Sequence, residues 1–158
     1  MPTHNGREFR AFLHEEFGPL RAIIMPSMPA ECATILVVDD EEPVLTAAAE
    51  MLRRAGFDVL MATSPPDALT LCREHPEPIH LALLDIVMPS MNGLELRECL
   101  RTEYPGIRVL YMSEYNHQEM AWRGVTEIPG DFLKKPFTSS KLVGKVNAGL
   151  WKRGLATA

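Results

Sequence analysis

The chain of 158 residues lacks the features that define several large classes of protein. It has no apolar run near the roughly 18 to 20 residues that a membrane-spanning helix needs, and no signal-peptide pattern at its start. Basic residues are outnumbered, with 16 Lys and Arg against 21 Asp and Glu and a net charge of −5. This balance argues against a nucleic-acid binder, which needs a basic face. We therefore expect a cytoplasmic protein without direct membrane or nucleic-acid partners.

Cysteine is scarce, and its spacing argues against a disulfide framework or a zinc site. Cys32, Cys72 and Cys99 form an odd set without a CxxC pair. Cys72 and Cys99 fall in helical patterns and are interpreted as small core residues. The five histidines are scattered and lack the spacing of metal ligands.

The chain divides into an extension, one domain and a tail. Residues 1–30 contain an apolar helical stripe over Arg7–Phe17 and a proline-containing linker, and we predict an extension of unknown role. Residues 31–152 form the domain, since 46% apolar content suffices for one core. Residues 153–158 form a C-terminal tail.

Within the domain, short apolar strands alternate with helical patterns, as in repeated βαβ units. We expect strands at 34–38, 57–61, 79–84, 107–111 and 131–134. Between them we expect helices near 42–55, 65–75, 94–104 and 115–123, and a last helix capped by Thr138. The pattern predicts an α/β fold with a three-layer, doubly wound sheet of five parallel strands.

Three acidic residues follow two of the predicted strands. Asp39 and Asp40 follow the first strand, and Asp85 follows the third. Both strands are fully apolar, as buried parallel strands are, and ligand sites of open α/β sheets lie where the carboxyl ends of such strands meet. Three carboxylates packed together repel one another unless a cation compensates. The sequence therefore predicts a site for a hard divalent metal ion.

Further residues at the strand ends complete a pattern: Met88-Pro89, Asn92-Gly93, Ser113 and Lys135-Pro136-Phe137. Together with the three acids, and in this order, they make residues 34–150 resemble the receiver domain of two-component response regulators. The segments 110–113 and 132–137 most resemble receivers attached to hybrid sensor kinases. The resemblance implies a flavodoxin-like receiver fold with strand order 2-1-3-4-5.

A carboxylate can accept a phosphoryl group as an acyl phosphate. The transition state of this transfer is loose, so catalysis is mainly positioning and charge neutralisation. We interpret Asp85 as the phosphoacceptor. Lys135 supplies a cation that pairs with a phosphoryl oxygen, and with Asp85 before phosphorylation. The hydroxyl of Ser113 donates to another phosphoryl oxygen.

The expected cofactor is Mg²⁺, held directly by Asp40 and Asp85 and through a bound water by Asp39. The resemblance adds the backbone carbonyl of Val87 as a further ligand. It also implies that Phe132 is a switch aromatic, which turns inward when a hydroxyl residue moves toward the phosphate.

The two residues after Ser113 are expected to control access to Asp85, and the first of them departs from the receiver pattern. Glu114 stands where receivers usually have Gly or Ala, and its charge would repel an incoming phosphoryl group. Tyr115 is placed to shield the acyl phosphate from water. The segment 124–130, with its Pro129-Gly130 turn, implies a short preceding helix, so we expect a monomer or weak homodimer.

The leading interpretation is a phosphorelay receiver that accepts its phosphoryl group from a histidine kinase or histidine phosphotransfer protein and signals to a downstream partner protein. It would be no enzyme beyond its own phosphorylation and dephosphorylation. We expect no DNA-binding output domain after Leu150. One alternative, a Mg²⁺-dependent aspartyl phosphatase, needs a second acid where Val87 stands. A non-phosphorylated pseudo-receiver typically loses an acid or the lysine, and a flavodoxin-like cofactor binder needs a phosphate loop that this chain lacks.

Overall fold

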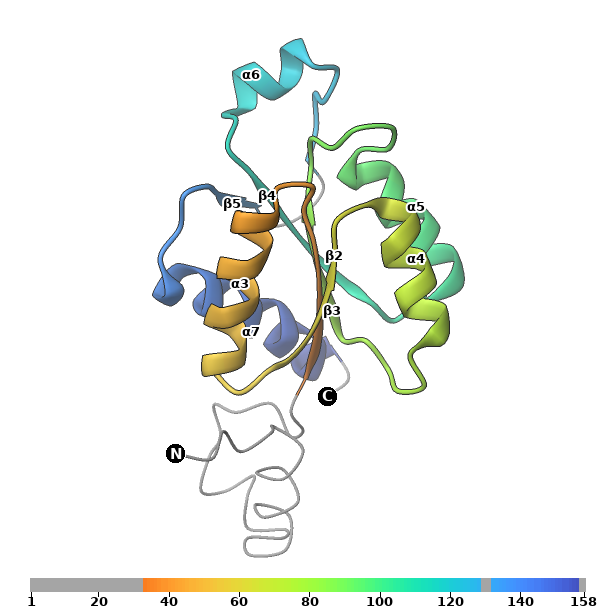
Figure 1. Cartoon of the computed structure of the whole chain (residues 1–158). Helices are drawn as coiled ribbons and strands as arrows, with labels where there is room; N and C mark the ends of the chain where they lie inside the picture. Colours follow the sequence, from red (N-terminus) through yellow and green to blue (C-terminus); the bar gives the residue numbers. More distant parts are fainter. Residues whose placement is uncertain (1–32, 129–131, 157–158) are drawn as a thin grey trace, which may run out of the picture.

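The computed structural model describes residues 33–128 and 132–156, which form a parallel sheet between two layers of helices (Figure 1). The strands are β1 (Thr34–Val38), β2 (Asp58–Ala62), β3 (Leu81–Asp85), β4 (Arg108–Ser113) and β5 (Phe132–Lys134). They lie in the order β2-β1-β3-β4-β5, and every adjacent pair is parallel. The predicted fold class and strand order are confirmed.

Two pairs of helices cover the two faces of the sheet. Helices α3 (Glu42–Arg54) and α7 (Ser139–Ala156) pack on one face, and α4 (Pro65–Glu74) and α5 (Gly93–Glu103) on the other. The short α6 (His117–Trp122) lies above the carboxyl ends of the strands in the view of Figure 1. Within the part of the chain that the structure describes, no helix has the length and apolar character to span a bilayer.

The strands are apolar throughout because both faces of the sheet are covered. Successive β1 residues point to opposite faces, so Leu36 and Val38 pack toward α4 and α5, whereas Ile35 and Val37 pack toward α3 and α7. All four side chains are fully buried. The central strands are thereby held firmly, and the residues at their carboxyl ends occupy defined positions.

Local signals in the sequence set the ends of the helices. The hydroxyl of Ser64 accepts a hydrogen bond from the Asp67 N–H, and that of Thr138 accepts one from the Lys141 N–H. The predicted cap at Thr138 is confirmed. After α3, Gly56 adopts a φ of 97°, the left-handed conformation of a helix C-terminus that glycine accommodates without strain.

Several predicted boundaries were wrong by one or two residues. The ladder between β3 and β4 pairs Asp85 with Met112, so β3 includes Asp85 and β4 continues to Ser113. Helix α6 is shorter than predicted because a capping box at Asn116 starts it only at His117. Ala55, the last residue of the helix predicted near 42–55, is exposed beyond the end of α3.

Three predictions concern residues outside those that the structure describes, and the prediction of buried cysteines holds for one of two. The helix over Arg7–Phe17, the Pro129-Gly130 turn and Asp131 all lie outside them. Cys72 is buried, as predicted, whereas Cys99 is only half-buried, and both thiols are free.

Candidate functional site

The three predicted acids meet at the carboxyl ends of β1 and β3. One carboxylate oxygen from each of Asp39, Asp40 and Asp85 lies within 4.8 Å of the others. Asp39 is fully buried and Asp85 is 4% exposed, whereas Asp40 faces solvent. The side chain of Asp39 also accepts a hydrogen bond from the Glu41 N–H, which ties it to the start of α3. The predicted convergence of the acids is present.

Lys135 enters this cluster from the end of β5. Its Nζ donates to Asp39 Oδ2 at 2.5 Å and lies 3.4 Å from Asp85 Oδ2. The expected pairing with Asp85 is therefore present, but Asp39 is the closer partner. The backbone N–H of Lys135 donates to the Ser113 carbonyl, which anchors the lysine to the end of β4. Its buried ammonium partly neutralises the two buried carboxylates.

The electrostatics of the cluster leave one carboxyl group poorly compensated. Burial raises the pKa of Asp85 to about 8; the charge of Lys135 lowers this pKa, and the carboxylate of Asp39 raises it. Hydrogen bonds from Lys135 and from the Val87 N–H also lower it. Burial alone would lower the pKa of Lys135, but its hydrogen bond to Asp39 and the neighbouring carboxylates raise it. Carboxylate oxygens this close suit a hard cation such as Mg²⁺.

A glycine beside Asp85 positions the backbone that carries it. The Gly93 N–H donates to the Ile86 carbonyl at 2.9 Å, which closes the loop after β3. A Cβ atom on Gly93 would lie 2.5 Å from the Asp85 carbonyl oxygen, closer than real contacts allow. Only glycine therefore lets α5 begin against this backbone. The sequence showed Gly93 as part of a motif but not the contact that requires it.

The two residues after Ser113 lie at the edge of the cluster. Ser113 is fully buried, and its Oγ accepts a hydrogen bond from the Tyr115 N–H at 3.1 Å. The guanidinium carbon of Arg123 lies 4.2 Å from the centroid of the Tyr115 ring, a cation–π contact. Glu114 is exposed. Arg123 was not singled out from the sequence, because nothing in its spacing indicates this contact.

Phe132 lies apart from the acids. It pairs with Tyr111 in the β4–β5 ladder and is half-buried. Its ring centroid lies 5.6 Å from that of His117, the first residue of α6, with the planes tilted by 45°. Phe132 was predicted from the sequence, whereas nothing in the spacing of His117 indicated this ring contact.

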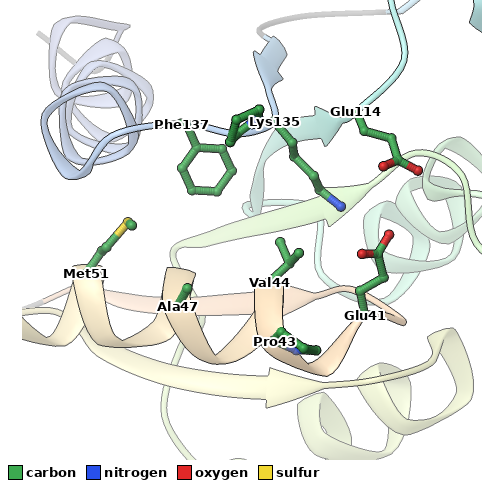
Figure 2. A pocket seen from close by; sticks show the side chains of 9 residues that line it. Glu41, Pro43, Val44, Ala47, Met51, Glu114, Lys135 and Phe137 are labelled. Atoms are coloured by element: carbon green, nitrogen blue, oxygen red, sulfur yellow. The ribbon is translucent and has the colours of Figure 1, made fainter.

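A groove of about 450 Å³ opens beside Lys135 (Figure 2). Its lining comes from α3, from the turn after β4 and from the segment after β5: Glu41, Pro43, Val44, Ala47, Met51, Glu114, Lys135, Pro136 and Phe137. Of this set, Glu114 and Lys135 were assigned roles from the sequence, and Pro136 and Phe137 were recognised only as part of a motif.

Comparison with known proteins agrees with this geometry. Residues 35–147 match the response regulator receiver domain family. The "Probable transcriptional regulatory protein TcrX" of Mycobacterium tuberculosis is 34% identical over 126 residues, 78% of this chain and 52% of that protein. "Sensor kinase CckA" of Brucella abortus is 31% identical over 121 residues, 77% of this chain but 13% of that protein. The chain thus spans about half, or less, of these relatives.

Solved structures show the same fold. The crystal structure of a receiver domain protein from Clostridium thermocellum aligns with a TM-score of 0.67 and 26% identity, covering 78% of this chain and 98% of that one. A CheY-like receiver domain protein from Methanospirillum hungatei JF-1 aligns with a TM-score of 0.68 and 25% identity, covering 80% and 99%.

Proposed function

Because this chain belongs to the response regulator receiver domain family, we propose that it is a phosphorylation-dependent switch whose phosphoacceptor is Asp85. One observation supports this most directly. The Asp85 carboxylate lies at a strand end, beside the acids Asp39 and Asp40 and beside the buried ammonium of Lys135. This arrangement places an acceptor oxygen beside groups that can neutralise an arriving phosphoryl group.

In the proposed transfer, an oxygen of Asp85 bonds to phosphorus as the bond from phosphorus to the donor's histidine nitrogen breaks. The electron pair of that bond returns to the imidazole, and Asp85 becomes an acyl phosphate. Lys135 pairs with one phosphoryl oxygen, and the Ser113 hydroxyl donates to another. Hydrolysis later releases phosphate and regenerates the carboxylate. The domain would thus act on itself and turn over no other substrate.

Mg²⁺ fits the donor set, with Asp40 and Asp85 as direct ligands, Asp39 through a water and the Val87 carbonyl as a further ligand. Bound there, it would offset the charge of the clustered carboxylates and of the phosphoryl oxygens.

The proposed switch links Ser113 to Phe132. Ser113 exchanges its hydrogen bond with the Tyr115 N–H for one with the phosphate, and its displacement frees space on the face of the sheet that carries Tyr111 and Phe132. Phe132 then turns inward and leaves the ring of His117. A downstream partner protein would recognise the changed surface near α6.

Three residues would modulate access to Asp85. Glu114 is exposed beside Lys135 in the groove and would slow anionic donors. Tyr115, held by Arg123, would shield the acyl phosphate from water. Val87 occupies the place of a second acid, which disfavours rapid turnover of the aspartyl phosphate.

The proposed donor is a histidine kinase or histidine phosphotransfer protein in the cytoplasm, and the proposed state is a monomer or weak homodimer. In the two relatives, named as a transcriptional regulatory protein and a sensor kinase, the similar segment is part of a longer protein.

The test is labelling with acetyl phosphate and Mg²⁺, followed by intact mass and peptide mapping. Wild type and the control Asp58→Asn should gain one phosphoryl group, because Asp58 lies at the opposite ends of the strands. Asp85→Asn should gain none. Labelling of Asp85→Asn at the wild-type level would refute the proposed acceptor.

A further inference from the structure

The groove beside Lys135 has an apolar body. Helix α3 contributes Val44, Ala47 and Met51, and the segment after β5 contributes Phe137. In Figure 2, Met51 and Phe137 lie at the end of the groove that is far from the Lys135 ammonium. A volume of about 450 Å³ has room for one or two apolar side chains.

The other end of the groove is acidic. Glu41, at the start of α3, and Glu114, after β4, face the same opening in Figure 2. Both are exposed, and neither has an ion-pair partner among the described residues. The ammonium of Lys135 is engaged by Asp39. The groove therefore suits an apolar stripe that carries a cation toward this end.

The chain itself contains a segment of this kind ahead of β1. Within residues 7–17, which lie outside the described residues, Phe9, Leu13 and Phe17 follow one another at intervals of four. In the helix that this spacing predicts, residues four apart lie on one face. Arg10 follows Phe9 directly and would lie at the edge of that face. The segment thus combines an apolar stripe with a cation.

The connection between this segment and the domain is long enough for docking. Residues 18–32 form the connection, and these 15 residues span up to about 50 Å when extended. They lead to Ala33, which belongs to the same core cluster as Leu52, near the carboxyl end of α3. Helix α3 has 13 residues and is about 20 Å long. The segment can therefore reach every part of the groove.

We propose that residues 7–17 of this chain dock in the groove, antiparallel to α3. The apolar stripe packs on α3, and Arg10 lies between Glu41 and Glu114. The direction follows from the connection, because the end of the segment nearest to residue 18 lies nearest to the carboxyl end of α3. The cation then reaches the acidic end of the groove.

The spacing of the two sets of residues agrees with this arrangement. The stripe repeats every four residues, and the α3 residues that line the groove are three or four apart. Phe17 then lies beside Met51, and Leu13 lies beside Ala47. Because alanine is small, the two helices approach most closely at the pair of Leu13 and Ala47.

Docking would inhibit phosphorylation of the same chain. Lys135 lines the groove, and its Nζ lies 3.4 Å from Asp85 Oδ2. A docked segment covers the opening beside Lys135 and narrows the approach to Asp85, so that a phosphoryl donor gains full access only after the segment is released. This consequence rests on the proposed role of Asp85, whereas the docking itself does not.

Disulfide trapping in the full chain tests the docking. Leu13→Cys is combined with Ala47→Cys, which lines the groove, or with Thr46→Cys, which is exposed but does not line it. Cys32→Ser and Cys99→Ser remove two native thiols, and the remaining one is buried. On oxidation with diamide, the intramolecular cross-link to position 47 should form about tenfold faster, because a disulfide needs close and suitably directed Cβ atoms. Equal rates at positions 46 and 47 would overturn the docking.

Charge exchange tests the cation. Arg10→Glu should slow the cross-link between positions 13 and 47 about threefold, because exposed ion pairs are lost. Adding Glu41→Arg should restore most of that rate. The control Arg21→Glu, in the connection, should leave the rate unchanged. No effect of Arg10→Glu, or the same effect of Arg21→Glu, would contradict the assigned pairing.

Labelling of Asp85 by acetyl phosphate tests the inhibition in the chain with its native cysteines. Arg10→Glu should be labelled about threefold faster than wild type, since the released fraction rises by that factor, and Arg21→Glu should match wild type. Equal rates for wild type and Arg10→Glu would remove the inhibitory role. If no variant is labelled at Asp85, the proposed function fails, while a cross-link specific to position 47 would still establish the docking.

Discussion

Replacing Asp85 by asparagine should stabilise the metal-free protein at neutral pH. The side chain keeps its shape, but a buried carboxyl group with a pKa of about 8 is replaced by a neutral amide. In the unfolded chain this carboxyl ionises near its ordinary value, about 4. Between about pH 4 and pH 8 the folded state therefore keeps a proton on Asp85 that the unfolded chain has lost, and the free energy of unfolding falls as the pH rises. Below about pH 4 both states are protonated and the cost disappears.

The size of the effect follows from proton linkage. Each pH unit between the two pKa values changes the free energy of unfolding by about 1.4 kcal/mol, so the cost at pH 7 reaches at most about 4 kcal/mol. The buried asparagine amide retains a desolvation cost of about 1–3 kcal/mol where it is not hydrogen-bonded. We therefore expect Asp85→Asn to raise the free energy of unfolding by about 1–3 kcal/mol at pH 7.

The assay is urea unfolding of wild type, Asp85→Asn and the control Asp58→Asn, at several pH values between 5 and 8 in EDTA. The advantage of Asp85→Asn should grow with pH, whereas Asp58→Asn should stay within about 0.5 kcal/mol of wild type. Excess Mg²⁺ should then stabilise wild type more than Asp85→Asn, because the variant lacks a ligand. An Asp85→Asn protein that is less stable than wild type at pH 8, or an advantage independent of pH, would refute the reasoning.

Three further outcomes are expected. Gly93→Ala should lower the free energy of unfolding by about 1–3 kcal/mol and reduce labelling of Asp85, because the added Cβ atom would meet the Asp85 carbonyl oxygen. The control Gly144→Ala lies in α7 with open space around it. It should raise the free energy of unfolding by about 0.5–1 kcal/mol in the same urea titration. Tyr115→Ala should shorten the lifetime of the acyl phosphate, and an unchanged decay rate in EDTA would remove its shielding role. A double-mutant cycle on Arg73 and Glu103, which join α4 to α5 through two hydrogen bonds, should show a small coupling that vanishes in 1 M salt; coupling that survives salt would contradict a surface ion pair.

The order of the elements and the position of the acids were predictable from the sequence. Strands buried on both faces must be apolar throughout. The runs at 34–38 and 79–84 can therefore be distinguished from the helices between the strands, which are apolar on one face only. Chain connectivity then brings their carboxyl ends to one edge. The caps at Ser64 and Thr138 are local as well, because each hydroxyl bonds to a backbone N–H three residues further on.

Contacts between distant residues were decided only by the tertiary structure. Lys135 and Asp39 are 96 residues apart, and the packing of β1 and β5 makes Asp39, rather than Asp85, the closer partner. The requirement for Gly93 arises because the start of α5 lies against the backbone of Asp85. The groove likewise joins α3 to segments near residues 114 and 137. Sequence periodicity records which face of an element is buried, but distances between side chains depend on how the elements pack.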